Sequence, residues 1–233
     1  YDTSSGFSTT GLFVAVGGSG TISTSSDNGT TWNSKQISGF GQFNDVIHAN
    51  DKFVVAGNGI LHSTDGINWT EASYSESGTT FIDIAFGNNV FIAVGTNSSG
   101  GTSFTSKDNG TSWTKSSTSM QWGNLGVAYG NGKFIRVGGF GYIWSSDDNG
   151  TTWDNITSSN CCASNTRGLN GITFGENFGG SNSDLFMAVG NYRTVIESWD
   201  NGSSWGQGIG STYPPTIYGV AHGNGQFVMV GQD

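Results

Sequence analysis

One short phrase returns five times along this chain of 233 residues. It reads serine, any residue, aspartate, Asn-Gly, two further residues and tryptophan, and the second copy is shorter by one residue. The copies occupy residues 25–32, 63–69, 106–113, 146–153 and 198–205. Successive tryptophans are 37 to 52 residues apart. This spacing predicts one supersecondary unit built several times in succession, within a single domain that covers residues 1–233.

A second phrase lies upstream of each tryptophan, with phenylalanine, three mostly apolar residues and then glycine. Its copies occupy residues 13–17, 53–57, 91–95, 134–138, 186–190 and 227–231, and the last copy has no tryptophan after it. These runs are short, rich in branched and aromatic residues, and closed by glycine, so they predict buried strands. Other strand-like runs precede and follow each copy. No apolar period of 3.6 residues persists, so essentially no helix is expected.

Each unit is therefore expected to hold four antiparallel strands, with the tryptophan in the fourth. Four such strands in about 40 residues are the blade of a β-propeller, so the predicted fold is an all-β propeller. Six copies of the phenylalanine phrase against five of the tryptophan phrase leave the number of blades open. We favour six blade positions with an incomplete last blade, and a ring of five blades is the alternative.

The serine-to-tryptophan phrase resembles the Asp-box, also called the BNR repeat, of sialidases, xyloglucan-active hydrolases, sortilin-type receptors and photosystem II assembly factors. The resemblance covers nearly the whole chain. It implies that each box is a turn between the two outer strands of a blade, on the face away from the ligand. The box aspartates are then structural and not catalytic. They are Asp27, Asp65, Asp108, Asp148 and Asp200.

The arginines set this chain apart from the sialidases. A sialidase holds the carboxylate of its substrate with a cluster of three arginines. This chain has only Arg136, Arg167 and Arg193, and Arg136 lies inside a predicted strand. The three histidines are scattered and form no Ser/His/Asp arrangement. We therefore predict a non-catalytic member of the Asp-box group, with no cofactor and no metal site.

Charge limits the partners that the chain can have. The formal net charge is −9, from 17 acidic residues and 8 lysines and arginines. A nucleic acid or an anionic membrane surface needs a basic patch that this composition hardly supplies, so neither is expected as a partner. No apolar run has the length of a membrane-spanning helix. The sequence starts at Tyr1 without methionine or signal sequence, as expected of a mature or excised form.

The two cysteines, Cys161 and Cys162, are adjacent in a long predicted loop. They form either a strained vicinal disulfide in an oxidising compartment or two unpaired thiols. Seven Asn-x-Ser/Thr sequons permit glycosylation without requiring it. The acidic surface, rich in Ser, Thr and Gly, favours an extracellular or cell-surface location.

Aromatic residues gather in the loops expected at the ligand rim of the propeller. Sugars present apolar C–H faces, and exposed tyrosine and tryptophan rings next to Asn and Asp suit them. The alternative for each ring is that it packs beneath its loop. The candidate ligand-binding residues on these loops are Tyr74, Trp122, Tyr142, Arg167, Tyr192, Arg193 and Tyr213.

Asp45 and Asp83 occupy equivalent places at the start of innermost strands, where other units have glycine. Two carboxylates at a central channel are candidates for general acid and base, or for holding a cation. The favoured alternative is that they tie a strand end to its neighbour through hydrogen bonds.

These features predict a secreted or surface-displayed binding or adhesion propeller that recognises a carbohydrate or a cell-surface glycoprotein. One alternative is a glycoside hydrolase that uses Asp45, Asp83 or Glu76. Another is a structural module of an extracellular fibre or appendage, which assembles with copies of itself as a homo-oligomer.

Overall fold

The computed structural model describes residues 11–118, 123–157, 168–178, 183–207 and 215–232. Apart from two 3-10 turns, η1 (Gly139–Gly141) and η2 (Asn191–Arg193), its elements are all strands. The strands are β1 (Phe13–Val16), β2 (Thr21–Ser25), β3 (Asn33–Gln36), β4 (Phe43–Ala49), β5 (Lys52–Gly57), β6 (Ile60–Ser63), β7 (Thr70–Glu71), β8 (Ser73–Tyr74), β9 (Thr80–Gly87), β10 (Val90–Asn97), β11 (Gly100–Ser106), β12 (Ser112–Lys115), β13 (Asn124–Gly130), β14 (Lys133–Gly138), β15 (Ile143–Ser146), β16 (Asp154–Asn155), β17 (Leu169–Phe178), β18 (Ser183–Gly190), β19 (Val195–Ser198), β20 (Gly206–Gln207), β21 (Ile217–Gly223) and β22 (Gln226–Gly231). No helix in these ranges is long and apolar enough to cross a membrane.

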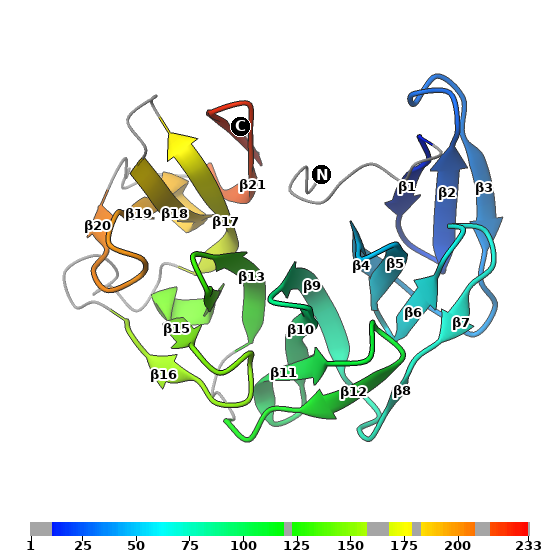
Figure 1. The fold of residues 1–233 in the computed structure, drawn as a ribbon, viewed down its shortest axis with the longest axis horizontal. Coiled ribbons are helices and arrows are strands. Elements are labelled where there is room, and N and C mark those ends of the chain that lie inside the picture. The colour runs from blue at the N-terminus through cyan, green and yellow to red at the C-terminus, as the bar shows by residue number, and fades with distance from the viewer. Residues whose placement is uncertain (1–10, 119–122, 158–167, 179–182, 208–214, 233) are drawn as a thin grey trace.

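The strands form six sheets that follow one another around an arc (Figure 1). We call the sheets blades 1 to 6: β1–β3, β4–β7, β9–β12, β13–β16, β17–β20 and β21–β22. Blades 2 to 5 each contain a four-stranded antiparallel meander, and blade 3 gains β8 as a fifth strand, parallel to β12. The prediction of an all-β propeller with six positions and an incomplete last blade is confirmed. Blade 1 has three described strands and begins at the second position of the repeat.

The glycine that closes each phenylalanine strand is needed because the neighbouring strand leaves no room for a side chain. At Gly95 an added Cβ would lie 2.1 Å from the carbonyl oxygen of Thr80, and at Gly57 it would lie 2.2 Å from that of Gln42. A side chain cannot fit where the second strand comes so close to the innermost one. The register of both strand pairs shifts at this point, as in a β-bulge.

Each box turn is held together by its serine and aspartate. In blade 3, Ser106 Oγ donates to Asp108 Oδ1 at 2.8 Å and accepts from the backbone of Gly110 at 2.9 Å. Asp108 also accepts from the backbone and hydroxyl of Ser112, at 2.9 and 2.6 Å. Similar bonds recur in the other four boxes. The carboxylates therefore serve the fold of the turn.

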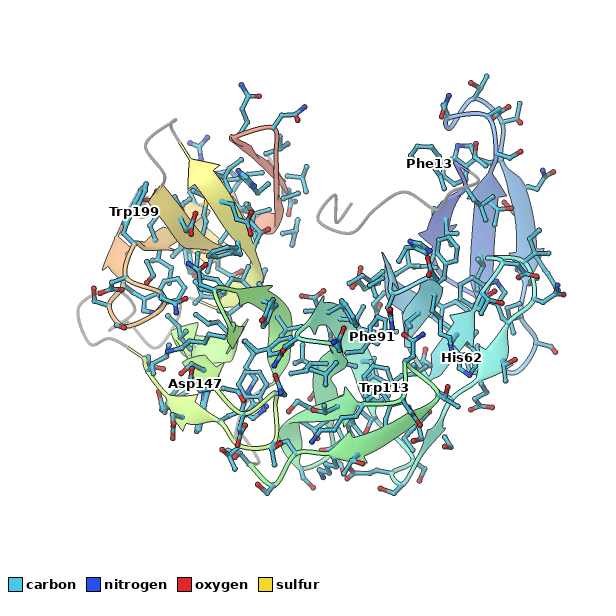
Figure 2. The ribbon with its side chains drawn as sticks, viewed as in Figure 1. Phe13, His62, Phe91, Trp113, Asp147 and Trp199 are labelled. Atoms are coloured by element: carbon cyan, nitrogen blue, oxygen red, sulfur yellow. The ribbon has the colours of Figure 1, made fainter. Side chains whose placement is uncertain are left out.

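The box tryptophans seal the contacts between blades. Trp113 lies in β12, whereas in the other four units the fourth strand begins one residue after the tryptophan, which corrects the predicted boundary. Phe91 and Trp113 of blade 3 are labelled in Figure 2. They belong to one buried cluster with Val54 and Ala56 of blade 2. At the junctions between blades 2 and 5, the later blade thus contributes phenylalanine and tryptophan rings, and the earlier blade contributes mainly aliphatic side chains.

Acid should destabilise this fold through the box aspartates. Hydrogen bonds from Thr31 and Ser25 lower the pKa of Asp27 to about 2, and bonds from Asn68 and Ile67 lower the pKa of Asp65. Lowered native pKa values mean that the stabilisation is complete above about pH 4 and is lost as the pH falls toward 2. The urea midpoint should therefore fall over this range. Asp27→Asn should make the fall less steep, and a midpoint that is constant from pH 4 to 2 would contradict this account.

Candidate functional site

Two equivalent turns stand on the rim opposite the box turns. They join the second and third strands of blades 4 and 5, whereas the boxes join the third and fourth strands, so the two kinds of turn lie at opposite ends of the blades. In blade 4 the backbone of Gly138 donates to the carbonyl of Tyr142 at 3.1 Å, and in blade 5 that of Gly190 donates to the carbonyl of Thr194 at 2.9 Å. We call these two turns, built around η1 and η2, the rim turns.

Each rim turn places an aromatic residue in the left-handed region. Phe140 has φ 59° and Tyr192 has φ 57°, and each is followed by a second residue with positive φ, Gly141 or Arg193. This pair of angles is the type I′ pattern, which favours Asn-Gly. A bulky residue there costs about 1–3 kcal/mol and is found mostly where function requires it. The Phe140 and Tyr192 side chains are nonetheless exposed, by 41% and 37%.

The corresponding turn of blade 1 shows what the fold alone needs. Gly17 and Thr21 make the same pair of backbone hydrogen bonds, and Ser19 occupies the left-handed position with φ 56°. A small polar residue therefore suffices for the turn. The aromatic rings of blades 4 and 5 are therefore not required for the turn to form.

The two rim turns sit against the inner wall of the following blades. Gly139 lies close to blade 5, because an added Cβ at Gly168 would be 3.9 Å from its Cα atom, and within blade 4 its backbone donates to Gly123 at 3.1 Å. In blade 5, Arg193 donates from its backbone to Pro215, which precedes blade 6, at 2.9 Å, and Asn170 of the same blade donates to the Asn191 side chain at 3.1 Å. These bonds fix both turns, so that the exposed rings stand on rigid supports.

Glycine should relieve the strain of a rim turn. Phe140→Gly removes a partly exposed side chain from a left-handed position, so we expect the free energy of unfolding to rise by about 0.5–1 kcal/mol. Tyr192→Gly should behave alike, and Ser19→Gly serves as the control that removes no ring. The measurement is chemical denaturation. A loss of more than about 1 kcal/mol on Phe140→Gly would show that the ring is part of the core.

Asp45 and Asp83 tie neighbouring blades together. Asp45 Oδ2 accepts from the backbone of Ile84 at 3.0 Å, and Asp83 Oδ2 accepts from the backbone of Val127 at 2.7 Å. The two carboxyl groups also hydrogen-bond to each other. Burial raises the pKa of both groups, and the charge of Asp45 raises that of Asp83 further. In blade 4 the equivalent residue is Gly126, where an added Cβ would lie only 3.1–3.2 Å from the backbone of blade 5.

Contact between these carboxyl groups does not suit glycoside hydrolysis. A retaining or inverting hydrolase keeps its two carboxyl groups about 5 Å or more apart, so that the sugar and a water fit between them. Glu76 is also engaged, because it accepts from Asn97 at 3.0 Å and pairs with Lys115 at 2.7 Å. The described residues hold no group of three His, Cys, Asp or Glu side chains suited to a metal ion.

The remaining candidates are distributed unevenly. Tyr74 lies in β8 at the outer edge of blade 3, and its ring packs edge-on against Phe81 and Phe104 at 5.5 and 6.2 Å. Tyr142 is half-buried beside the η1 turn, and Arg193 is exposed beside Tyr192. The structure thus gathers Tyr142, Tyr192 and Arg193 on the rim of blades 4 and 5, away from Tyr74. Five candidates lie outside the described residues: Trp122, Cys161, Cys162, Arg167 and Tyr213.

Sequence reasoning missed two exposed aromatic residues. Phe140 reads as part of an ordinary Phe-Gly turn, and only its alignment with Tyr192 and Ser19 points to it. Trp199 sits inside the fifth box, at the variable position between serine and aspartate, and is 52% exposed. The residue type was the signal for Trp199. At the same position, the other four boxes carry Ser26, Thr64, Lys107 and Asp147.

Comparison with known proteins supports the fold. No protein-family model matches the chain, and no curated protein matches it. Among solved structures it is similar to YCF48 from Cyanidioschyzon merolae, with a TM-score of 0.68 and 15% identity over 95% of this chain and 77% of that one. YCF48 bound to the D1 peptide matches with a TM-score of 0.56 and 18% identity over 94% and 84% of the two chains. An ancestral GH74 enzyme has a TM-score of 0.67 and 18% identity over 89% of this chain.

These neighbours are β-propellers, and the chain shares their fold. It spans only 31% of the length of the GH74 enzyme. At such identities the similarity concerns the fold alone.

Proposed function

We propose that this chain is a non-catalytic binding propeller of the Asp-box group, which recognises carbohydrate through the rim turns of blades 4 and 5. The observation that carries this proposal is the pair of exposed rings held in left-handed backbone. The fold tolerates serine at the same place in blade 1, so the rings and their strain are best explained by a ligand that covers them.

The chemistry of the rim favours a neutral sugar. Flat aromatic faces stack against the C–H faces of a pyranose, and Arg193 and the side-chain amide of Asn191 lie on the same turn to bond hydroxyl groups. With a net charge of −9 the chain repels large anionic ligands. A glycan of a cell surface or a cell-surface glycoprotein is therefore the proposed partner, and an extracellular or surface location is proposed with it.

Peptide recognition is the second candidate. It is favoured by one structural neighbour, the YCF48 chain bound to the D1 peptide. An exposed tyrosine next to an arginine also suits a peptide. Hydrolysis is less favoured, because Asp45, Asp83 and Glu76 are engaged in bonds within the fold.

A glycan array tests the proposal. The wild-type chain should bind a defined set of neutral glycans, and the double variant Phe140→Ala/Tyr192→Ala should lose that binding while it keeps the wild-type circular dichroism spectrum. Release of reducing sugar from a bound glycan, abolished by Asp83→Asn, would instead favour the hydrolase. Failure of the wild-type chain to bind any glycan would exclude the carbohydrate reading, and a peptide array would then address the second candidate.

A further inference from the structure

Asparagine followed by glycine occurs eight times in this chain, and the pair is chemically reactive. Glycine has no side chain to hinder attack of its backbone nitrogen on the amide carbon of the asparagine. Attack releases ammonia and closes a succinimide ring, which water opens to aspartate or isoaspartate. The reaction is favoured where no other group holds the glycine N–H or the asparagine amide. The eight asparagines are Asn28, Asn58, Asn109, Asn131, Asn149, Asn170, Asn201 and Asn224.

The box serines hold the glycine N–H in four of these pairs. In blade 1, Ser25 Oγ accepts from the backbone of Gly29 at 2.9 Å. The equivalent bonds in the boxes of blades 3, 4 and 5 measure 2.9, 2.9 and 2.8 Å. In blades 3 and 5 the asparagine is held as well, because Asn109 and Asn201 each donate to a carbonyl of the preceding blade. A box glycine must therefore lose a bond before its nitrogen can attack.

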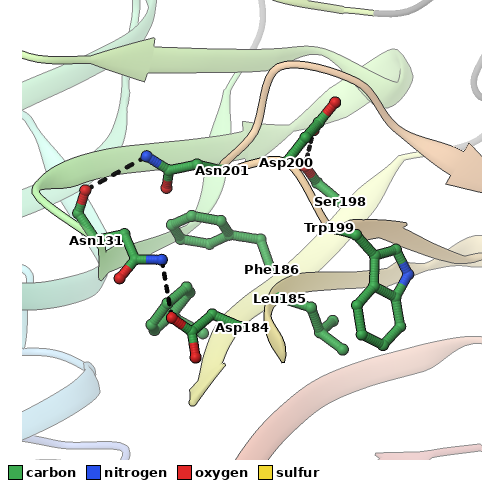
Figure 3. A pocket seen from close by; sticks show the side chains of 9 residues that line it. Asn131, Asp184, Leu185, Phe186, Ser198, Trp199, Asp200 and Asn201 are labelled. Atoms are coloured by element: carbon green, nitrogen blue, oxygen red, sulfur yellow. Dashed lines mark hydrogen bonds between the residues drawn. The ribbon is translucent and has the colours of Figure 1, made fainter. Parts of the chain in front are cut away.

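Three further pairs are restrained through the asparagine side chain. Asn58 Oδ1 accepts from the backbone of Gln42 at 2.6 Å. Asn170 donates to a carbonyl of blade 6 at 2.9 Å. Asn131 donates to Asp184 of blade 5 at 3.1 Å (Figure 3). In each of them the amide carbon is kept away from the following nitrogen.

The eighth pair, Asn224 and Gly225, has none of these restraints. It forms the turn between β21 and β22, with φ values of 50° and 69°, and both residues are exposed. Two successive positive φ values are the type I′ pattern. Within the part of the chain that the structure describes, nothing bonds the Asn224 side chain or accepts from the Gly225 N–H. An added Cβ at Gly225 would meet no atom within 4 Å.

The hairpin that carries this turn also has little support. Blade 6 contains β21 and β22 as its described strands, whereas the hairpin of Asn131 belongs to a sheet of four. Val228 and Val230 of β22 are 62% and 61% exposed. Few packed neighbours lower the free energy of local opening. Opening gives the Gly225 nitrogen and the Asn224 amide the rotational freedom that ring closure needs.

We propose that Asn224 is a site of spontaneous covalent modification, and that the box serines protect the other exposed pair, Asn28 and Gly29, from the same reaction. A bond forms between the Gly225 nitrogen and Asn224 Cγ, and the bond from Cγ to the amide nitrogen breaks. The amide nitrogen leaves as ammonia with the proton of the Gly225 N–H. Water then adds to one of the two ring carbonyls, so no oxidant or reductant is needed.

The product changes the turn in two ways. Either acid adds a negative charge, and isoaspartate also lengthens the backbone inside a turn of two residues. The hairpin covers apolar side chains of blade 5, because Ile217 and Val220 pack in one cluster with Leu185 and Val189. We therefore expect isoaspartate at residue 224 to loosen the contact between blades 5 and 6.

The test is peptide mapping by mass spectrometry of the folded chain during incubation in mildly alkaline buffer, with the aspartate and isoaspartate products separated. Product should form at Asn224 at least about tenfold faster than at Asn28, because Asn28 is equally exposed but its glycine is bonded to Ser25. Ser25→Ala should raise the rate at Asn28 towards that at Asn224. Asn224→Gln should abolish the product at residue 224, because glutamine closes its larger ring far more slowly.

Two controls separate the effect of the fold from that of the sequence. Asn131 has the same following glycine in an equivalent turn, but its amide is bonded, so it should react more slowly than Asn224. In denaturant these pairs should react at similar rates. Equal rates at Asn224 and Asn28 in the folded chain would overturn the proposal, and so would a preference for Asn224 that persists in denaturant. An unchanged rate at Asn28 in a folded Ser25→Ala variant would contradict the protective role of the serine.

Discussion

Trp113→Ala should lower the free energy of unfolding by about 3–5 kcal/mol, whereas Trp32→Ala should lower it by no more than about 1 kcal/mol. Both tryptophans end a box turn, and both donate from Nε1 to the carbonyl of the box glycine at 3.1 Å. The two substitutions therefore remove the same local hydrogen bond. They differ in burial, because Trp113 is 4% exposed and Trp32 is 39% exposed.

The difference follows from the place of each blade in the arc. Trp113 faces blade 2 and packs in one cluster with Val54 and Phe91. No described sheet precedes blade 1, so Trp32 has no such partner. Denaturant titration of both variants provides the measurement. An equal loss of unfolding free energy in the two variants would contradict the view that the box tryptophan stabilises the fold by packing against the adjacent blade.

Arg136→Met should raise the free energy of unfolding by about 1–3 kcal/mol. Arg136 is fully buried in β14, at the position that Ala93 and Ala188 hold in other blades. Its Nη1 atom donates to Ser103 at 2.9 Å, and its guanidinium lies 4.3 Å from the ring centroid of Trp153. The guanidinium also lies 5.6 Å from the ring centroid of Trp144. No described carboxylate pairs with Arg136, so one hydrogen bond and two ring contacts must offset the loss of hydration.

The pH dependence of the stability gain in Arg136→Met tests whether the gain comes from removing a buried charge. Burial lowers the pKa of Arg136 from 12.5 to about 9. Below pH 9 the arginine is charged in both the folded and the unfolded chain, and the full cost of burying the charge is present. Above pH 9 the folded chain releases the proton first, so wild-type stability rises relative to that of Arg136→Met. The advantage of the variant should therefore shrink above pH 9, and a variant that is less stable than wild type at pH 7 would contradict this explanation.

The repeat predicted the strands of this fold because its two phrases encode local requirements. The closing glycines, such as Gly95, mark where a Cβ would meet the neighbouring strand, and the box residues, such as Asp108, mark a turn that needs their oxygens. The number of sheets was harder to predict. The number depends on the angle between successive blades. All the contacts of each blade interface set this angle, so a short sequence motif does not predict it.

The candidate site was predicted only in part. Tyr142, Tyr192 and Arg193 were expected on the rim and lie there together, but Tyr74 was expected with them and packs instead at the edge of blade 3. On the rim turns the sequence analysis missed Phe140, because the sequence gives no sign of a positive φ at a phenylalanine. Side-chain direction and backbone strain arise from the packed blades and are not visible in residue type.

The central claim is that the rings of the rim turns bind the ligand. The most direct test is the dissociation constant of the best glycan from the array, measured by calorimetry for wild type, Phe140→Ala, Tyr192→Ala and Phe140→Tyr. Loss of a stacking ring should weaken binding at least about tenfold, which corresponds to about 1.4 kcal/mol, whereas Phe140→Tyr should stay within about twofold of wild type. Wild-type affinity in both alanine variants would contradict the account.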